Sequence, residues 1–223
     1  MTGKRRYDDA CRFAHALDLV GERWALLVVR ELLLGPKRFT DLRAGLPNAS
    51  PNVLSQRLRE LESAGVIRRR MLAPPAASRV YELTGWGREL EPVVTHLGRW
   101  GARAPVPPDS TCIGGDSIVL ALRSLFDPEA AAGVKATCEL RLGDDVYRVG
   151  VADGKLDLAR GPAAEPEAVL RTDPDTFAAV LTGALKLTDA ARSGAVEIDG
   201  PRRAVARLLE LFPMPEPAVL ARA

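Results

Sequence analysis

One stretch decides the fold of the first half of this chain: residues 50–65 read SPNVLSQRLRELESAG. Ser50 can cap a helix, because its hydroxyl accepts a hydrogen bond from a free backbone N–H of the first turn. Pro51 suits the first helical position. The leucines that follow are spaced i, i+4 and i+7, which is the spacing of one buried helix face: Leu54, Leu58 and Leu61. The stretch therefore predicts an amphipathic helix over residues 50–64, ended by the glycine.

The opposite face of this predicted helix is polar. A turn of 100° per residue places Asn52, Gln56 and Arg59 away from the leucines, with Ser55 at the edge. Asn or Gln can pair bidentately with adenine, and Arg with guanine. A recognition helix presents its N-terminal residues to the major groove. Taken alone, such side chains indicate an ordinary solvated helix face, so the DNA-binding interpretation depends on the neighbouring segments.

A β-hairpin is predicted directly after the helix. Residues 66–72 and 79–83 have the composition of strands, and the Pro- and Ala-rich residues 73–78 form the turn. The first strand carries three consecutive arginines, and strand alternation sends Arg68 and Arg70 to one face and Arg69 to the other. Arg79 lies on the returning strand. Cations beside a helix of this kind favour contact with DNA phosphates or the minor groove, and a solvated strand edge is the alternative for each of them.

Three further helices are predicted upstream. Residues 10–19 form the first, and residues 24–34, apolar on nearly all sides, form a buried central helix stopped by Gly35-Pro36. Residues 38–45 form a short third helix with Thr40 as a candidate cap. Lys37 and Arg38, at its start, are candidates for holding a DNA backbone. A short helix, a turn and a capped amphipathic helix make a helix-turn-helix, and the hairpin behind it makes a wing.

A last helix is predicted to begin at the cap Thr84 and to continue to residue 100, kinked at Pro92. Its apolar residues follow a 4-3-4-3 spacing that makes a narrow seam: Trp86, Leu90, Val93, Leu97 and Trp100. Such a seam serves either a second copy of the chain or packing within its own domain.

Residues 11–101 resemble the HxlR-type winged helix regulators of bacteria. The resemblance rests on Gly21-Glu22-Arg23-Trp24, on residues 38–42, on residues 57–62 with Gly65, and on Tyr81-Glu82-Leu83-Thr84. It implies a homodimer on a two-fold symmetric operator in double-stranded DNA. It also implies dimerisation through the first and last helices, which adds Phe13 and Leu17 to the seam.

Some members of that family sense oxidants through a cysteine near the start, usually followed by proline. Here Cys11 is followed by Arg12. Arg6 and Arg12 are close enough in sequence to lower the pKa of the thiol, and the thiolate is the reactive form. A small buried apolar residue is the alternative interpretation of Cys11.

The charge of the chain is divided unevenly. Residues 1–105 hold 18 Lys and Arg against 11 Asp and Glu, a net charge of +7, whereas residues 106–223 hold 13 against 18, a net charge of −5. Only the first half therefore suits a polyanion. Three prolines within residues 105–108 indicate a stiff linker. We predict a DNA-binding and dimerisation domain at 1–102, a linker at 103–110 and a second domain at 111–223.

The second half has an α+β pattern. A helix is predicted at 116–126, strands at 137–142, 146–151, 156–159, 168–171 and 196–198, and helices at 175–181, 188–192 and 202–212. Residues 113–213 resemble the sterol-carrier (SCP2-like) domain, notably at 171–177, 181–183, 190–194 and 198–200. The resemblance implies an apolar tunnel for a lipid-like ligand, with the candidate lining Phe126, Phe177, Leu181, Leu208 and Phe212. Ordinary core packing is the alternative for each, so an apolar effector and a merely stiffening domain both stay open.

Several function classes are disfavoured. The three cysteines and two histidines form no C-x-x-C pair, which disfavours a zinc finger, and no catalytic signature or cofactor motif is present. No uninterrupted apolar run reaches the length of about 18 residues that a membrane span needs. The N-terminus is polar, so we expect a cytoplasmic protein. The prediction is a mainly α winged helix-turn-helix domain followed by an α+β SCP2-like domain, in a dimeric DNA-binding regulator. The rival is a lipid carrier that uses the first domain to dimerise.

Overall fold

The computed structural model describes residues 7–74, 76–105 and 114–219. The chain forms two compact units, Met1–Val94 and Thr95–Ala223. The predicted linker at 103–110 lies mostly outside the described residues, so its boundaries stay a prediction. None of the helices in the described ranges has the length and apolar character of a membrane span.

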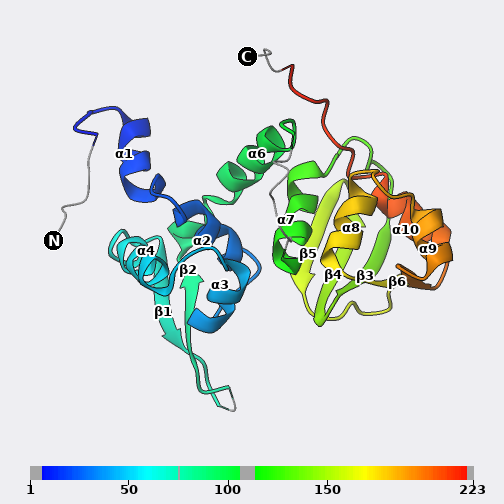
Figure 1. The fold of residues 1–223 in the computed structure, drawn as a ribbon, viewed down its shortest axis with the longest axis horizontal. Coiled ribbons are helices and arrows are strands. Elements are labelled where there is room, and N and C mark those ends of the chain that lie inside the picture. The colour runs from blue at the N-terminus through cyan, green and yellow to red at the C-terminus, as the bar shows by residue number, and fades with distance from the viewer. Residues whose placement is uncertain (1–6, 75, 106–113, 220–223) are drawn as a thin grey trace. The chain divides into compact units, whose positions relative to one another are not determined.

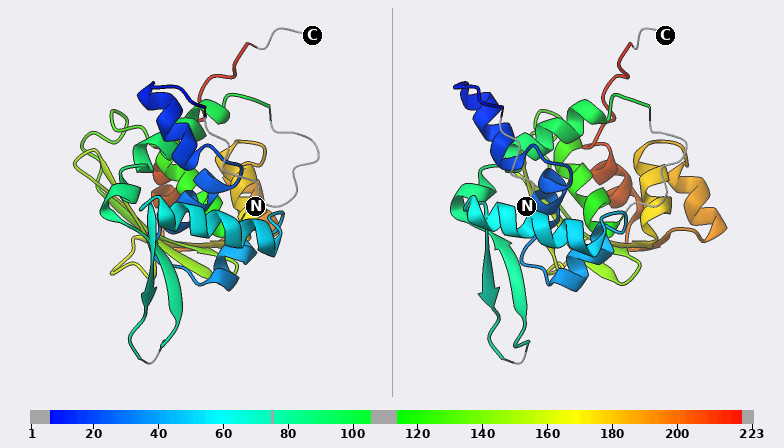
Figure 2. Two further views of the ribbon diagram at one scale, coloured as in Figure 1. Left: turned by 90° about the vertical axis from the view of Figure 1, so that its left-hand side faces the viewer. Right: turned by 60° about the vertical axis from the view of Figure 1, so that its left-hand side comes forward.

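The first unit has the predicted order of elements (Figure 1). Helices α1 (Arg12–Val20), α2 (Ala25–Leu32), α3 (Phe39–Gly45) and α4 (Pro51–Ser63) precede the antiparallel strands β1 (Ile67–Met71) and β2 (Arg79–Leu83). A short helix α5 (Gly85–Arg88) follows, and α6 (Glu91–Gly101) crosses into the second unit. In both views of Figure 2 the β1–β2 hairpin stands out from the helices of its unit as a long arm. This is the predicted helix-turn-helix with its wing.

The core of the first unit joins α2, α4 and the hairpin. Leu54, Leu58 and Leu61 of α4 are buried, as their spacing predicts. They lie in a core to which α2 contributes Val28 and Val29, both fully buried. Burying an aliphatic side chain of this size contributes about 1.5–3 kcal/mol. The core therefore fixes which side of α4 faces inward and which side is left to solvent.

Two predictions about helix ends are wrong. Thr40 does not cap α3; the N-cap is Arg38, whose backbone N–H donates to the Asp41 carboxylate at 3.0 Å. The helix predicted over 84–100 with a kink at Pro92 is not continuous: α5 ends at Arg88 and α6 begins at Glu91. The reason is Pro92: it has no N–H to donate to the carbonyl of Arg88, and its ring would clash with that carbonyl. Pro92 instead occupies the first turn of α6, where no such donor is needed.

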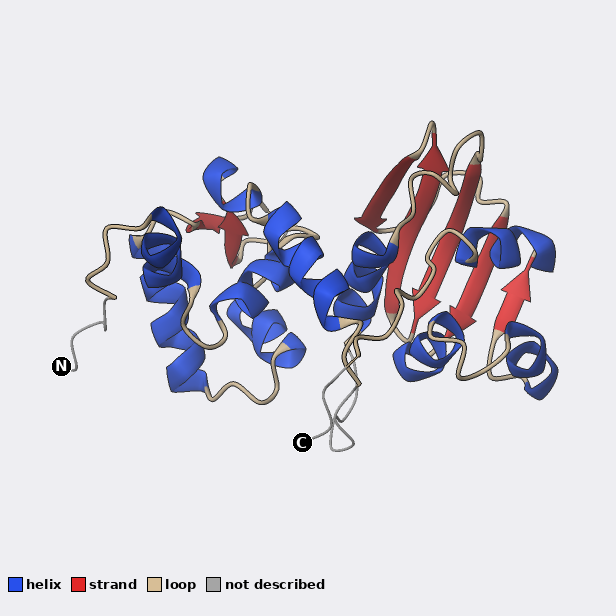
Figure 3. Cartoon of the chain, turned by 90° about the horizontal axis from the view of Figure 1, so that it is seen from above, coloured by secondary structure: helices blue, strands red, loops and turns tan. Residues whose placement is uncertain are grey.

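The second unit is an α+β fold, as predicted. Helix α7 (Gly115–Leu125) precedes β3 (Ala136–Leu142), β4 (Asp145–Ala152), β5 (Lys155–Arg160) and β6 (Ala168–Thr172). Then come α8 (Pro174–Leu181), α9 (Leu187–Ser193), β7 (Glu197–Asp199) and α10 (Arg202–Leu209). The five strands form one mixed sheet in the order β5-β4-β3-β6-β7, with β3 and β6 parallel and the other pairs antiparallel (Figure 3).

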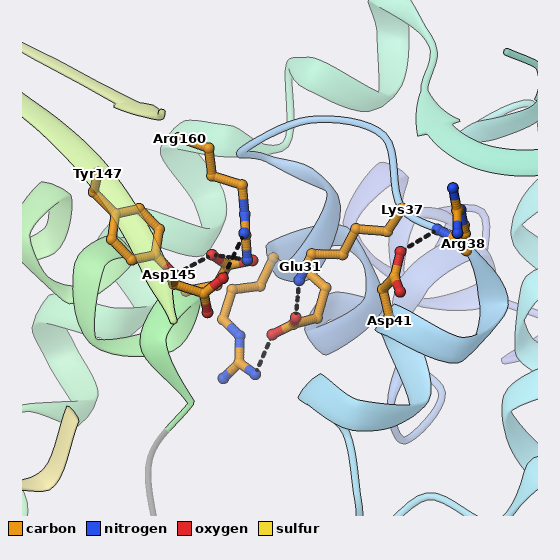
Figure 4. Close-up of polar contacts among 9 residues, drawn as sticks. Glu31, Lys37, Arg38, Asp41, Asp145, Tyr147 and Arg160 are labelled. Carbon is orange, nitrogen blue, oxygen red and sulfur yellow. Dashed lines mark hydrogen bonds and ion pairs between the residues drawn. The ribbon is translucent and has the colours of Figure 1, made fainter. Parts of the chain in front are cut away.

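A polar cluster centred on the buried Asp116 and Tyr147 connects the start of α7 to this sheet. The Tyr147 hydroxyl donates to the Asp116 carboxylate at 2.7 Å, and Arg160 reaches the same carboxylate at 2.6 Å. Arg160 also pairs with Asp145 at 2.9 Å (Figure 4). Burial and the neighbouring Asp116 raise the pKa of Tyr147 far above its usual value. A Cβ at Gly115 would lie 2.8 Å from the Tyr147 hydroxyl oxygen, so this close approach requires glycine.

Candidate nucleic-acid interface

Helix α4 presents the polar face that its sequence predicts. Asn52, Gln56 and Arg59 are exposed, and Ser55 is half-buried at the edge. Among the described residues, no hydrogen bond or ion pair engages the side chain of Asn52 or Arg59. These two side chains are therefore available to a ligand that approaches α4 from solvent.

The start of α4 is fixed by local chemistry. The Ser50 hydroxyl accepts a hydrogen bond from the Val53 N–H at 3.4 Å, and Pro51 occupies the first turn. A Ser cap of this kind contributes about 1 kcal/mol to helix stability. Ser50 itself is exposed. The N-terminal turn, which carries the polar face, is thus held in one conformation.

A buried arginine holds the middle of α4. Arg57 is 8% exposed and forms ion pairs with Glu60, one turn along the helix, and with Glu22 at 3.5 Å, in the loop between α1 and α2. Glu60 in turn accepts a hydrogen bond from the Gln56 side-chain amide at 3.0 Å. Sequence reasoning missed this chain of contacts, although the i, i+3 spacing of Arg57 and Glu60 was a signal for part of it.

The arginines of the wing lie on the two faces that strand alternation predicts. Arg68 and Arg70 both donate to the carboxylate of Glu82 on β2, at 2.8 and 2.9 Å. Arg69, on the other face, donates to Glu62 of α4 at 2.9 Å. The hydrogen bond from Arg69 lowers the pKa of Glu62. All three arginine side chains remain about half exposed, so each can still reach a phosphate beside the hairpin.

Two further predicted DNA-contacting cations, Arg79 of the wing and Arg38 at the start of α3, have exposed side chains. Arg79, on β2, makes no side-chain hydrogen bond or ion pair within the described part of the chain. Arg38 is exposed at the start of α3, where its backbone N–H bonds to Asp41 (Figure 4). Both positions therefore agree with a surface that meets a polyanion.

Lys37 differs from the other predicted cations. It is 8% exposed, and its ammonium group donates to Glu31, a carboxylate of α2 that is 1% exposed (Figure 4). Glu31 also accepts from Arg30 at 2.9 Å. The Lys37 backbone pairs with Tyr81 through two hydrogen bonds, which adds a short strand segment beside β2. This environment makes Lys37 part of a buried ion pair rather than of the exposed surface where a phosphate would bind.

Apolar side chains are exposed on α1, α5 and α6. Phe13 and Trp100 are the most exposed, at 72% and 71%, and Trp86, Val93 and Leu97 are about half exposed. Leu17 and Leu90 are half-buried. Trp86 and Leu90 also line a small pocket of about 250 Å³ with residues of α1, so part of the predicted seam packs within its own unit. Val93, Leu97 and Trp100 keep the seam spacing along α6.

Cys11 is exposed at the N-terminal end of α1. Backbone N–H groups of Ala14 and Phe13 stabilise its thiolate and lower its pKa. Arg6, which the sequence suggested as a partner, lies outside the described residues. The lowering therefore comes from the helix start itself, a cause that sequence reasoning did not identify.

The second unit has a shallow apolar groove of about 700 Å³ between the α8–α9 segment and α10. Of the five predicted ligand-contacting residues, Leu181 and Phe212 line it. Phe177 and Leu208 are buried in the core, and Phe126 packs on Phe212 with ring centroids 5.9 Å apart. Residues that line the groove but were not predicted to do so include Leu187, Leu209 and Met214.

A three-helix body, a capped helix with a free polar face and a two-stranded cationic wing define a winged helix-turn-helix domain. The chain belongs to the HxlR-like helix-turn-helix family, whose model matches residues 19–107. It is 40% identical over 89 residues to the HTH-type transcriptional regulator YvaP of Bacillus subtilis, covering 40% of this chain and 82% of that protein. It is 33% identical over 97 residues to the HTH-type transcriptional regulator YodB of the same species, covering 44% and 87%.

Solved structures and a second family model add to these relatives. The oxidised form of the redox regulator HypR is 31% identical, with a TM-score of 0.41, and covers 44% of this chain and 100% of that one. A model described as alkyl sulfatase C-terminal matches residues 119–219. The UbiJ-SCP2 ubiquinone synthesis protein is 14% identical, with a TM-score of 0.33, over 38% of this chain and 69% of that one.

Proposed function

We propose that this chain is a homodimeric DNA-binding transcriptional regulator. In this proposal α4 enters the major groove, and the β1–β2 wing contacts the backbone or the minor groove. The observation that carries it is the exposed polar face of α4, which lies opposite three buried leucines and beside a hairpin rich in arginine. The relatives YvaP and YodB of Bacillus subtilis, which are HTH-type transcriptional regulators by name, support the same function.

The polar side chains divide into two roles. Asn52, Ser55, Gln56 and Arg59 read base edges, because amides and guanidinium groups match the donors and acceptors of the major groove. Ser50 contributes through the cap. The exposed cations position the protein on phosphates without reading sequence: Arg38, Arg68, Arg69, Arg70 and Arg79. When DNA binds, the wing arginines exchange their Glu62 and Glu82 partners for phosphate, or share them.

Two copies of the chain bind one operator with two-fold symmetry. Large exposed apolar side chains on α1 and α5, and separately along α6, support this part of the proposal, since such side chains favour a protein partner. A Trp100→Glu variant places a charge on the apolar side chains of α6. It should sediment as a monomer where the unaltered chain sediments as a dimer, while a Met214→Glu control on the second unit should leave the dimer intact. A monomeric unaltered chain would refute this part.

Salt-dependent binding tests the DNA-binding role. Fluorescence anisotropy with DNA from upstream of the chain's own gene should give log affinity that falls steeply with log salt, by about 0.9 for each phosphate contacted. Arg59→Ala should reduce the preference for this DNA over unrelated sequence. Arg69→Ala should weaken binding to all sequences alike and reduce the salt slope. Affinity that does not depend on salt, or equal losses across sequences in both variants, would contradict the proposal.

A second candidate function is binding of an apolar ligand by the second domain. The apolar groove between α8–α9 and α10 favours it, and the ligand would either control DNA binding or be carried. Native mass spectrometry of the purified chain should detect a co-purified apolar molecule, and Leu181→Glu should abolish that signal. A carrier without a regulatory role would retain the ligand and show negligible affinity for DNA.

A further inference from the structure

A second layer of contacts lies behind the exposed face of α4. The Gln56 side-chain nitrogen Nε2 donates to Oε1 of Glu60 at 3.0 Å. The other oxygen of Glu60 accepts from Arg57, and a second Arg57 nitrogen lies 3.5 Å from Glu22. Because Arg57 is 8% exposed, its side chain is held by the surrounding protein and does not move freely at the surface. Glu60 is therefore held from the inner side and presents one oxygen to Gln56.

Chemistry then fixes the orientation of the Gln56 amide. A carboxylate held by a guanidinium group is an acceptor only, so the amide nitrogen of Gln56, and not its carbonyl oxygen, must face Glu60. One of the two Nε2 hydrogens is used in that bond. The remaining edge of the amide carries one acceptor, the Oε1 oxygen, and one donor, the second Nε2 hydrogen. Gln56 is exposed, so this edge points into solvent from the face that we assign to DNA.

We propose that Glu60 is a positioning residue that commits Gln56 to adenine. This inference rests on the proposed function of α4. In the major groove adenine offers a donor at N6 and an acceptor at N7, which match the free edge of Gln56. Guanine offers two acceptors, O6 and N7, and would need two donors at the same place. Since one Gln56 hydrogen is already bonded to Glu60, one acceptor of guanine would face the carbonyl oxygen of Gln56. Two acceptors cannot form a hydrogen bond, so guanine is disfavoured at this position.

The neighbouring carboxylate Glu62 provides a matched control. It lies on the same helix and has the same charge, but it binds Arg69 of the wing and not a base-reading side chain. Removing either carboxylate takes one negative charge from α4 and should strengthen binding to all DNA by a similar amount. Only the loss of Glu60 should change which base is preferred at one position.

The experiment uses the full chain and an operator selected from random duplexes. Each A·T pair of the operator is replaced in turn by G·C, and affinities are measured by competition anisotropy. The unaltered chain should disfavour guanine by about 5- to 150-fold at the position that Gln56 reads. Gln56→Ala should lose this preference, Glu60→Ala should lose it at the same position, and the double variant should lose no more than either alone. Glu62→Ala should keep it.

The outcomes separate the two proposals. If Glu60→Ala keeps the preference, or loses preference equally at all positions, the role of Glu60 is refuted while DNA binding stands. If the unaltered chain selects no duplex, the proposed function fails instead. Should Glu60→Ala not fold, as judged by circular dichroism, Glu60→Gln replaces it. Its amide can turn either way, so the preference should fall in part at that position, and an unchanged preference overturns the inference.

Discussion

Lys37→Met separates a structural role of this lysine from a role in DNA binding. The substitution leaves the Glu31 carboxylate, 1% exposed, without its ammonium partner. Breaking a buried ion pair from one side costs about 3–5 kcal/mol. The lower end applies here, because Arg30 still donates to Glu31 at 2.9 Å. We therefore expect the first domain to lose about 3 kcal/mol of stability, which lowers the melting temperature of a domain this size by at least about 10 °C.

Tryptophan fluorescence makes the assay specific to the first half of the chain, because all three tryptophans lie within residues 1–102. The double variant Lys37→Met with Glu31→Leu should recover most of the loss, since an apolar pair of similar volume replaces a buried ion pair without an uncompensated charge. Below the melting temperature, Lys37→Met should leave the salt slope of DNA binding unchanged. An unchanged melting temperature together with a slope reduced by about 0.9 per site would show that Lys37 binds phosphate, and our interpretation would be wrong.

Other predictions concern single groups. Ser50→Ala should destabilise the first domain by about 1 kcal/mol in urea titrations, because α4 loses its cap, and a loss near zero would contradict the capping role. Burial raises the pKa of Glu82, but hydrogen bonds from its two arginine partners outweigh burial and hold it below the usual value. The depressed pKa means that Glu82 stabilises the fold above the usual carboxyl pKa and that this contribution is lost as pH falls through its folded pKa. In thermal melts at decreasing pH, the Glu82→Gln variant should therefore lose less stability than the unaltered chain, because it has no carboxylate to protonate at this position. Burial raises the pKa of Cys138 to about 11, so iodoacetamide at pH 8 should alkylate exposed Cys11 and spare Cys138 in the native chain, as peptide mass spectrometry would show. Phe177→Ala should cost the second domain about 3–5 kcal/mol, and a much smaller loss would mean that this ring is not core.

Local patterns were enough to predict α4 and the hairpin. The cap, the first-turn proline and the leucine repeat all lie within one stretch, and the predicted strands match β1 and β2 to within a residue or two. The faces of the wing arginines also followed from strand alternation alone. Where each decision depends on neighbours within one or two helical turns, the sequence is a sufficient guide.

Predictions that depend on distant partners were less complete. The burial of Lys37 depends on Glu31 in the preceding helix and on Tyr81 in the wing, so its exposed appearance in the sequence was misleading. The break before α6 depends on the carbonyl of Arg88, which Pro92 cannot serve. In the second domain, Phe177 and Phe212 are the same residue type and were both predicted to line a pocket, yet only Phe212 lines the groove. The hydrophobicity of a side chain predicts that it is buried, but it does not predict whether the side chain lines a groove.

The strand order of the second domain has a consequence for how the chain acquires its structure. Strands β3 and β6 are parallel neighbours, yet about 25 residues of chain separate them. Forming this pair therefore costs the entropy of closing a long loop before the contacts between the two strands can offset it. In the first domain the hairpin closes over a short turn. We expect a fast refolding phase in tryptophan fluorescence from the first domain and a slower one in circular dichroism from the second. During synthesis the first domain could then complete its fold while the later strands are still being made.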